Sequence, residues 1–330
     1  MVENPFTRTI LKWYSEFGRD LPWRRTRNPY AIWLSEIILQ QTRIAQGQAY
    51  WERFLARFPD VESLAAASED EVLRLWEGLG YYSRGRNLLA AARQIATRGS
   101  FPASFEEIRA LKGVGDYTAA AIGSIAFGLP LAVVDGNVYR VLSRYFGIET
   151  PIGSNAAKKE FTALAQSLLP AANPGDFNQA MMDFGALQCT PQSPACLTCP
   201  LADSCVALRT GRTASLPVRK APVKVRERQF HYIYIRCGGE TALRRRGPGD
   251  IWQGLWEPYL EEGELQGFPG MRLLKKGVRH QLTHQTLTAD FHLLECAEKP
   301  TLPEGFIWIP ESDLEQYAKP RLVNLLLQTL

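Results

Sequence analysis

Four of the six cysteines fall within 17 residues, and this cluster restricts the possible folds more than any other feature of the sequence. Cys189, Cys196, Cys199 and Cys205 follow the spacing Cys-x6-Cys-x2-Cys-x5-Cys. A disulfide scaffold spreads its cysteines through a short secreted chain, whereas one dense group in a long chain indicates metal ligation in a reducing compartment. Four thiolates can hold tetrahedral zinc or an iron–sulfur cluster, and the spacing leaves both open.

The length and composition are those of a folded protein with more than one domain. A chain of 330 residues, 45% of them hydrophobic, predicts two domains with sizeable cores. No apolar run reaches the ~18 residues of a membrane-spanning helix, and the N-terminus lacks an apolar signal segment. We therefore expect a cytoplasmic protein. The net charge of +4 permits a nucleic-acid partner without requiring one.

Residues 1 to about 210 contain helix signals and no strand-like alternation, which predicts an all-α domain. Capping boxes start two of the expected helices, at Ser68 with Glu71 and at Ser104 with Glu107. A loop at 78–84 carries two tyrosines and an arginine. The other helices are expected at Tyr30 to about Gln46, Asp116 to about Phe127, Gly136 to Tyr145, Ala156 to Leu169 and Asp176 to Leu187.

The chain changes character after the cysteine cluster. Residues 211–229 are basic and proline-containing, which predicts an extended linker. Residues 230–330 predict an α+β domain with a Gly238-Gly239 hairpin. The expected strands are Phe230–Ile235, Thr241–Arg244, Arg272–Lys276, Leu287–Cys296 and Phe306–Ile309, and a terminal helix capped by Ser312 with Glu315 is expected to carry Leu322, Leu325 and Leu326.

The stretch from Leu111 to Asn137 joins two candidate functional elements. Lys112, Gly113, Val114 and Gly115 lie between two helical patterns, where a tight turn can offer backbone N–H groups to a phosphate. Asp135 follows the second helix after a short loop. Both features also have structural interpretations, as an ordinary turn between core helices and as a helix cap.

Five further motifs, taken in order, resemble those of the adenine DNA glycosylases of the MutY type, in the helix–hairpin–helix DNA glycosylase superfamily. They are Leu21–Arg24 (LPWR), Trp33–Thr42 (WLSEIILQQT), Gly78–Arg84 (GLGYYSR), Val134–Val138 (VDGNV) and Phe177–Asp183 (FNQAMMD). With the cysteine cluster they cover nearly all of residues 5 to 205. The resemblance implies a helix–hairpin–helix catalytic domain at 1–210 whose loop 189–205 holds a structural [4Fe–4S] cluster.

By the same resemblance, Glu36 is the general acid that protonates the leaving adenine at N7. Asp135 stabilises the oxocarbenium ion or attacks it, and Asn137 hydrogen-bonds nearby. Cleavage of an N-glycosidic bond needs such an acid and such an anion. Glu36 lies beside an apolar helix face, where burial would raise its pKa, although a lone helical glutamate is more often solvated.

Tyr117 occupies the position where related bifunctional glycosylases have a lysine. That lysine forms an imine with the sugar, and a phenol cannot do so. The resemblance therefore implies a monofunctional enzyme that leaves an abasic site.

The base has to leave the duplex to be reached. The resemblance places Leu21, Trp23, Arg24 and Gln179 around the flipped adenine, and Gln41 and Tyr81 near the opposite base. It places Lys112 to Gly115 on the DNA backbone. Trp23 is equally consistent with an ordinary core tryptophan.

Residues 251–257 resemble the Nudix-like domain that reads 8-oxoguanine behind the catalytic domain of this family, although no Nudix hydrolase box is present. Where the family has Phe-Ser-His, this chain has Leu282, Thr283 and His284, which puts stacking on the oxidised base in question.

We thus expect a monomeric enzyme that hydrolyses adenine from A·8-oxoguanine and, more weakly, A·G pairs in double-stranded DNA, associated with the bacterial nucleoid. Two alternatives stay open: a mismatch glycosylase of other preference, such as T·G, and a non-catalytic DNA-damage binder.

Overall fold

The computed structural model describes residues 4–219 and 225–330. These fall into two compact units, one formed by residues 4–62 and 91–219 and the other by 63–90 and 225–330. Residues 220–224 of the predicted linker lie outside the described residues. Domain boundaries at 210 and 230 stay a prediction. No helix in the described ranges is long and apolar enough to cross a membrane.

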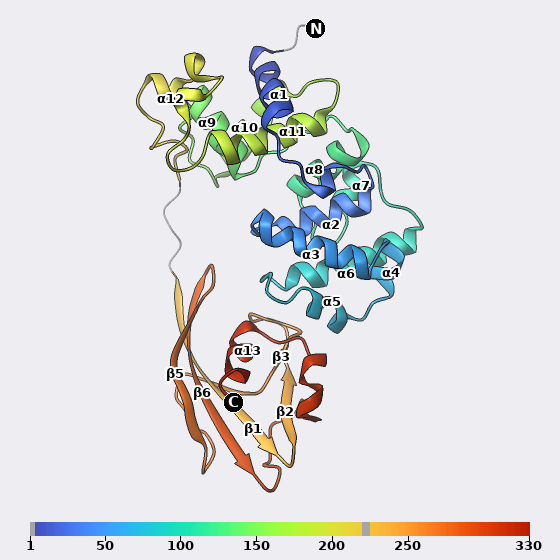
Figure 1. The fold of residues 1–330 in the computed structure, drawn as a ribbon, viewed down its shortest axis with the longest axis vertical. Helices are drawn as coiled ribbons and strands as arrows, with labels where there is room; N and C mark the ends of the chain where they lie inside the picture. The colour runs from blue at the N-terminus through green and yellow to red at the C-terminus, as the bar shows by residue number, and fades with distance from the viewer. Residues whose placement is uncertain (1–3, 220–224) are drawn as a thin grey trace. The chain divides into compact units, whose positions relative to one another are not determined.

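Residues up to 209 form helices and loops, so the predicted all-α character of this region is confirmed (Figure 1). The α-helices are α1 (Pro5–Phe17), α2 (Pro29–Leu39), α3 (Ile44–Arg57), α4 (Val61–Ala66), α5 (Glu69–Leu75), α6 (Ser83–Arg98), α7 (Phe105–Arg109), α8 (Asp116–Phe127), α9 (Gly136–Phe146), α10 (Asn155–Leu168), α11 (Pro174–Asp183) and α12 (Val206–Arg209). Helix α11 continues as one π-helical turn, Phe184–Gln188.

The predicted long helix from Tyr30 to Gln46 is wrong. Helix α2 ends at Leu39, and Gln41 adopts a left-handed backbone with φ +56° before α3 begins at Ile44. The apolar pattern continues through the break, and left-handed backbone at a non-glycine residue has no clear sequence signature. Hydrophobic periodicity alone therefore predicts one continuous helix where the structure has two.

Helices α7 and α8 form the predicted hairpin. The Ser104 side chain accepts a hydrogen bond from the Glu107 N–H and starts α7. Gly113 has φ +78°, which glycine adopts without steric cost, and the chain turns there into α8. Helix α8 runs from Asp116 to Phe127, as predicted.

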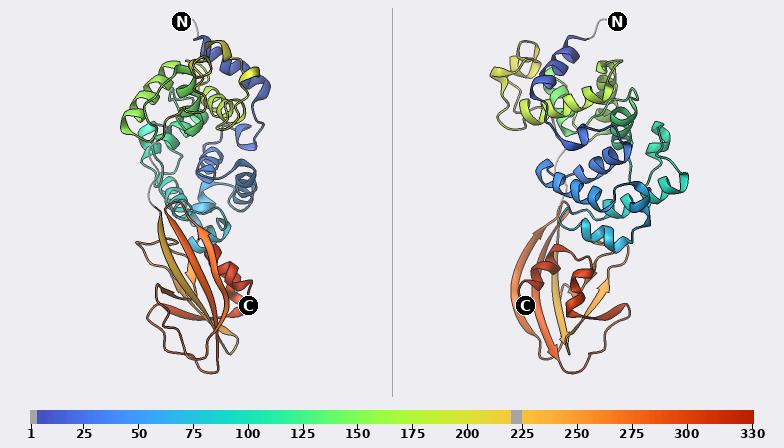
Figure 2. Two further views of the ribbon diagram at one scale, coloured as in Figure 1. Left: turned by 90° about the vertical axis from the view of Figure 1, so that its left-hand side faces the viewer. Right: turned by 45° about the vertical axis from the view of Figure 1, so that its right-hand side comes forward.

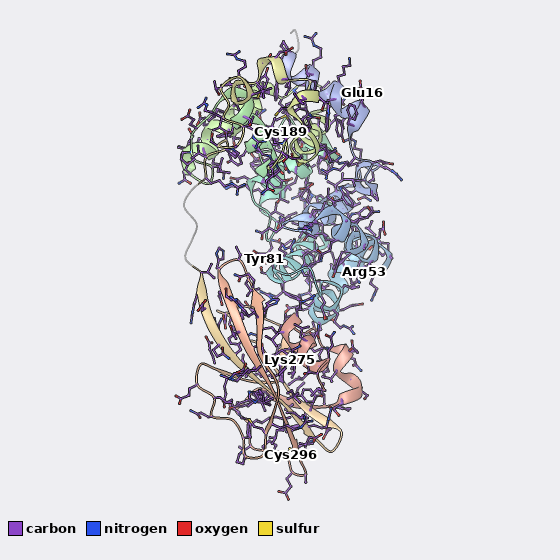
Figure 3. All side chains as sticks on the ribbon, turned by 60° about the vertical axis from the view of Figure 1, so that its left-hand side comes forward. Glu16, Arg53, Tyr81, Cys189, Lys275 and Cys296 are labelled. Atoms are coloured by element: carbon purple, nitrogen blue, oxygen red, sulfur yellow. The ribbon has the colours of Figure 1, made fainter. Side chains whose placement is uncertain are left out.

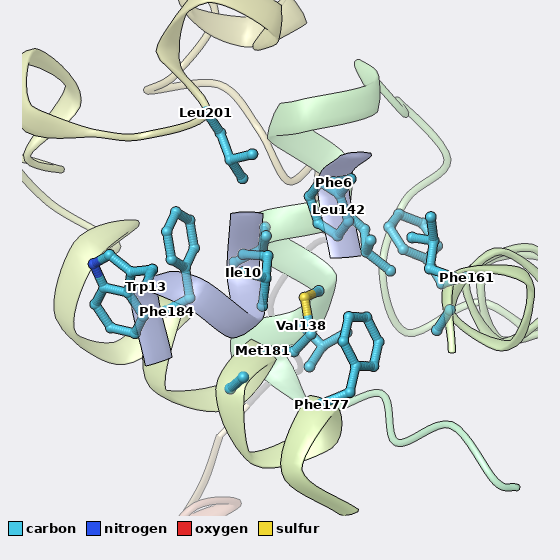
Figure 4. Close-up of a cluster of buried hydrophobic side chains, with 14 of the residues drawn as sticks. Phe6, Ile10, Trp13, Val138, Leu142, Phe161, Phe177, Met181, Phe184 and Leu201 are labelled. Carbon is cyan, nitrogen blue, oxygen red and sulfur yellow. The ribbon is translucent and has the colours of Figure 1, made fainter. Parts of the chain in front are cut away.

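One core of the first unit joins helices that are far apart in the sequence (Figure 4). Phe6 and Ile10 of α1, Leu142 of α9, Phe161 of α10 and Phe177 of α11 are all at most 2% exposed. Burying such side chains contributes roughly 1.5–3 kcal/mol each. This core fixes α9 and α11, which carry predicted site residues.

The second unit contains one mixed sheet, and its α+β class is confirmed (Figure 1, Figure 2). The strand order is β3-β2-β1-β6-β5, with β4 also paired to β1 and β7 to β2. The strands are β1 (Arg226–Cys237), β2 (Glu240–Arg245), β3 (Trp256–Glu257), β4 (Tyr259–Glu262), β5 (Arg272–Gln281), β6 (Gln285–Cys296) and β7 (Phe306–Pro310). Strands β1 and β6 are parallel, whereas the other pairs are antiparallel.

Helix α13 (Arg321–Leu327) covers one face of the sheet. Its Leu322, Val323 and Leu326 pack against Phe230 and Tyr232 of β1. A second apolar cluster lies on the opposite face. The unit also includes α5 and the start of α6.

One prediction for this segment needs correction. Ser312 does not cap the terminal helix: residues Glu311–Gln316 form a 3-10 helix, and α13 begins after Pro320. Proline disfavours helical backbone at the residue before it, so the helix cannot run through. At the ends of the predicted linker 211–229, Arg226 belongs to β1 and Leu216 is 3% exposed.

Candidate active site

A cavity of about 310 Å³ in the first unit collects most of the predicted catalytic and pocket residues. Its wall comes from three stretches of the chain, at 19–44, 117–137 and 179–186. The predicted residues that line it are Leu21, Trp23, Arg24, Glu36, Tyr117, Asp135, Asn137 and Gln179. Its volume lies at the lower end of the range for small-ligand pockets.

Glu36 projects from α2 into this cavity. Burial raises the pKa of its carboxyl to about 7; the Arg24 charge opposes this shift, and the Asp135 charge adds to it. A carboxyl with this pKa is largely protonated at slightly acidic pH and can still release its proton near neutrality. It therefore has the properties of a general acid.

Asp135 is the N-cap of α9, so the structural and functional interpretations of this residue coincide. One carboxylate oxygen accepts the N–H groups of Asn137 and Val138 at 2.8 Å each. The other accepts from Asn137 Nδ2 at 2.7 Å. Burial raises the pKa of Asp135, although these hydrogen bonds oppose the shift. The carboxylate is thereby held in one orientation toward the cavity.

An arginine pair on one buried aspartate forms another part of the wall, and sequence reasoning did not assign it a role. Asp183 is fully buried at the end of α11. Arg24 donates to both of its carboxylate oxygens, at 2.7 and 2.9 Å. Arg19 donates through Nε at 2.8 Å and through its backbone N–H at 2.8 Å. Asp183 belongs to the FNQAMMD motif, which was the available signal.

Hydrogen bonds also hold the side chains of Tyr117 and Gln179 at the cavity. Tyr117 donates its hydroxyl proton toward Met182 Sδ at 3.5 Å, and burial raises the pKa of Tyr117 well above its usual value. Tyr14 donates to Gln179 Oε1 at 3.5 Å. Tyr117 is therefore a neutral phenol, and no lysine lines the cavity within the described residues.

A hydrogen-bond chain connects Asp135 to the cysteine loop. Asn137, which donates to Asp135, accepts from Arg140 Nη2 at 2.8 Å. Arg140 Nε donates to the Cys189 carbonyl at 2.7 Å. A Cβ on Gly185 would lie 2.6 Å from Asn137 Cβ, so only glycine permits this approach of the π-helical turn. Arg140 was not predicted, although it lies two residues after the VDGNV motif.

The four clustered cysteines lie within electrostatic reach of one another (Figure 3 labels Cys189). Burial, reinforced by the charges of Cys189, Cys205 and Cys196, raises the pKa of the Cys199 thiol to about 11. No three His, Cys, Asp or Glu side chains in the described ranges already have the arrangement that holds one metal ion. Four adjacent thiolates need a cationic centre to offset their charge, and this donor set fits an iron–sulfur cluster.

Other predicted residues lie outside the cavity wall. Gln41 is exposed at the end of α2. In the hairpin, Lys112, Gly113 and Gly115 are exposed and Val114 is buried. The Lys112 N–H donates to Gln94 Oε1 at 2.8 Å and the Val114 N–H to the Leu111 carbonyl at 3.1 Å, so a phosphate contact would fall to the N–H groups of Gly113 and Gly115.

A second cavity, of about 470 Å³, lies within the second unit. It is lined by residues 78–83, 250–253 and 280–285. The Tyr81 hydroxyl and Thr283 Oγ1 are hydrogen-bonded there. Leu282 is partly buried against the sheet core, at the turn between β5 and β6. Three residues predicted to face the opposite base thus come together.

Comparison with known protein families matches three parts of the chain. Residues 34–169 match the HhH-GPD superfamily of base excision DNA repair proteins, 189–205 the iron–sulfur binding domain of endonuclease III, and 231–329 a NUDIX domain. The second match decides the cofactor left open by the cysteine spacing. The loop belongs to a [4Fe–4S] site rather than a zinc site.

Relatives match over most of the chain. An adenine DNA glycosylase of Buchnera aphidicola subsp. Baizongia pistaciae (strain Bp) is 33% identical, covering 86% of this chain and 84% of the relative. The chain belongs to the adenine DNA glycosylase family. The human adenine DNA glycosylase is 46% identical, covering 61% of this chain but 39% of its own length. The chain thus spans less than half of the mammalian family members it matches.

The family fold is also found among solved structures. A thermostable thymine-DNA glycosylase superposes with a TM-score of 0.58 and 33% identity, covering 62% of this adenine DNA glycosylase family member and 95% of the other chain. A trapped endonuclease III–DNA intermediate has a TM-score of 0.54 at 23% identity and the same 62% coverage, with 94% of that chain, and supports the fold alone.

Proposed function

We propose that this protein hydrolyses the N-glycosidic bond of adenine mispaired with 8-oxoguanine, and more slowly with guanine, in double-stranded DNA. The observation that carries the proposal is the placement of Glu36 and Asp135 in one cavity, where burial raises the pKa of both carboxyls and hydrogen bonds oppose the rise at Asp135. Glu36 has a pKa of about 7, whereas three hydrogen bonds stabilise the ionised Asp135 carboxylate. An acid and an anion in one pocket suit departure of a base and development of a sugar cation.

In this mechanism a flipped adenine occupies the cavity between Trp23 and Gln179. Glu36 donates its proton to N7 of the base as the glycosidic bond breaks. Asp135 stabilises the cationic sugar by its charge or by a short-lived covalent bond, and water completes the hydrolysis. Asn137 and Arg140 keep Asp135 in place. The iron–sulfur cluster, when bound, supplies structure to the loop 189–205 and no chemistry.

The reaction ends at an abasic site. Breaking the DNA strand through an imine requires an amine at the sugar, and Tyr117 occupies the corresponding position as a neutral phenol. We therefore propose monofunctional hydrolysis.

The second unit is proposed to read the base opposite adenine. The hydrogen bond between Tyr81 and Thr283, beside Leu282 in one cavity, supports this assignment. A hydroxyl and a leucine provide a polar contact and an apolar wedge, whereas an aromatic residue would stack. Gln41 is proposed to act near the opposite base, and the hairpin 112–115 to bind the DNA backbone through the N–H groups of Gly113 and Gly115.

A single-turnover base-release assay on duplexes with A·8-oxoguanine, A·G, T·G and A·T pairs tests the proposal. We expect release of adenine, fastest opposite 8-oxoguanine, with an intact strand and no borohydride-trapped enzyme–DNA adduct. If thymine is released from T·G faster than adenine is released from either mispair, the protein is a T·G mismatch glycosylase. Duplex binding without release of any base would identify a damage binder.

Glu36→Gln tests the acid in the same assay. The rate should fall at least about 100-fold while duplex binding persists, because the amide cannot donate the proton. Glu52→Gln, which changes an exposed glutamate of α3, is the matched control and should leave the rate unchanged. Near wild-type excision by Glu36→Gln would exclude Glu36 as the acid.

A further inference from the structure

The second unit contains two thiols that the proposed reaction does not use. Cys237 is the last residue of β1 and Cys296 the last residue of β6, and both are free. The parallel pairing of these strands sets the two residues directly opposite each other. They are separated by a long stretch of sequence, so only strand pairing brings them together.

The two side chains lie on the same face of the sheet. Ile233 and Ile235 alternate with Cys237 along β1, and Leu294 alternates with Cys296 along β6; these apolar residues form the cluster opposite α13. Neighbouring strands lie about 4.7–4.9 Å apart, which is within the Cα separation of about 4.4–6.8 Å that a disulfide spans. The sulfur atoms are therefore adjacent.

The two thiols differ in exposure, and the Cys296 thiol points toward β1. Cys237 is 5% exposed, whereas Cys296 is partly exposed. The Cys296 thiol donates toward the Arg236 carbonyl at 3.6 Å, which directs it back to β1. Burial, followed by the contact with Cys237, raises the pKa of Cys296.

In the described part of the chain, the cations nearest to this pair in sequence are already neutralised by carboxylates, and Lys299 is paired with Glu240. The nearest arginine, Arg236, is already paired with Glu295 at 3.2 Å and Glu311 at 3.0 Å. A thiol with a raised pKa reacts slowly, because only the thiolate is the nucleophile. Its oxidation should accordingly follow the thiol–disulfide equilibrium of the surroundings and should not act as a rapid peroxide trap.

We propose that Cys237 and Cys296 form a reversible disulfide by exchange with a low-molecular-weight disulfide. The Cys296 thiolate attacks one sulfur of glutathione disulfide, forming a mixed disulfide and releasing one glutathione thiolate. The Cys237 thiolate then attacks Cys296 Sγ and displaces the second glutathione. Two protein thiols are oxidised, one glutathione disulfide is reduced to two glutathione molecules, and the two protons pass to the released thiolates.

Local geometry makes this bond reducible. A relaxed disulfide needs Cβ atoms about 3.5–4.5 Å apart, slightly closer than the spacing of neighbouring strands. The strand ends must therefore approach, and Cys237 can move because Gly238 and Gly239 follow it with φ +58° and +81°. Cys296 is also partly exposed, and exposed disulfides are labile rather than permanent.

The disulfide lies far from the proposed recognition loop. Cys296 is at the opposite end of β6 from the 282–284 turn (Figure 3), a separation of about 36 Å for eleven residues of strand. Oxidation should therefore leave base excision unchanged. The proposed disulfide does not depend on the proposed excision of adenine.

The test equilibrates the full-length protein, with its cluster, in buffers of varied glutathione to glutathione disulfide ratio. Free thiols are then alkylated, and digested peptides are analysed by mass spectrometry. We expect a peptide joined through 237 and 296 in oxidising buffers, and its loss when excess glutathione is restored. The joined residues are identified directly, so the state of the cysteines at 189–205 does not affect the result.

Single variants provide the control. Cys237→Ala should accumulate glutathione on Cys296 and form no cross-link, and Cys296→Ser should leave position 237 unmodified. Circular dichroism checks that both variants fold. The proposal is overturned if glutathione binds to Cys296 of the wild-type protein and Cys237 never displaces it. It is also overturned if Cys296 forms a disulfide with another cysteine instead.

Discussion

As the proposed general acid, Glu36 has to keep a proton near neutral pH and still face the substrate. Burial supplies the first property, because removal from water disfavours the charged carboxylate. The positive charge of Arg24 limits this rise in the pKa of Glu36, and Arg24 is itself ion-paired with Asp183. A free arginine beside Glu36 would ionise the acid and remove its function.

The pH profile of excision is the first prediction at this scale. Only protonated Glu36 can act, so the single-turnover rate should fall as pH rises through about 7, approaching a tenfold loss per pH unit. The rate is measured with excess enzyme, and duplex binding at each pH is the control. A flat profile between roughly pH 6 and 9 would contradict the assignment.

The raised pKa of Glu36 also makes the stability of the folded protein depend on pH. The pKa of Glu36 is higher in the folded protein than its ordinary 4.5, so the folded state binds more protons above that pH. Its contribution to stability is present at low pH and is lost as pH rises through about 7. We expect Glu36→Gln to be at least as stable as wild type above this range, by urea unfolding.

At the scale of elements, α11 connects the core to the cavity. Phe177 packs in the core, while Asp183 at the end of the same helix receives Arg19 and Arg24. Burial alone would raise the pKa of Asp183, but the hydrogen bonds from Arg24 and Arg19 outweigh it and lower the pKa. The stabilisation by this ion pair is therefore present at neutral pH and lost in acid.

Asp183→Asn should lower the free energy of unfolding by about 3 kcal/mol, because it leaves two arginines without their buried partner. Excision should slow as well, since Arg24 loses its fixed position. Urea unfolding measures the first effect. Asp176→Asn, in the same helix but paired only at the surface with Arg27, should cost less than about 1 kcal/mol. Equal effects of the two variants would contradict the buried-pair argument.

At the scale of the whole molecule, the iron–sulfur loop is part of the fold of the first unit. Leu201, between Cys199 and Cys205, is 7% exposed and packs in the core with Phe184 and Ile10. Arg144 of α9 donates to the Thr190 carbonyl at 2.7 Å. The loop therefore packs with the core and is hydrogen-bonded to α9, the helix whose N-cap is Asp135.

Cys199→Ser should remove the visible absorbance of the cluster and lower the thermal midpoint by roughly 5 °C, as loss of about 2 kcal/mol of Leu201 burial predicts. Cys296→Ser, which removes a thiol in the second unit, is the matched control and should keep the absorbance. Retained absorbance in Cys199→Ser would show that Cys199 is not a ligand.

Local chemistry made part of the fold predictable. Caps such as Ser104 and Asp135, the glycine turn at 113 and the alternating residues of β1 encode their own conformation, because their partners lie a few residues away. Motif order then led to the family, the acid–anion pair and the cysteine ligands.

The remaining features depend on partners distant in sequence. Nothing near Asp183 indicates that two arginines about 160 residues away will neutralise it, and nothing near Gln41 indicates a left-handed break between α2 and α3. Cys237 and Cys296 lie far apart in the sequence, and only the parallel pairing of β1 and β6 places them side by side. Turns and caps follow from local residue chemistry, whereas ion-pair partners, helix breaks and strand register depend on which surfaces pack together, and packing is settled only when the whole chain folds.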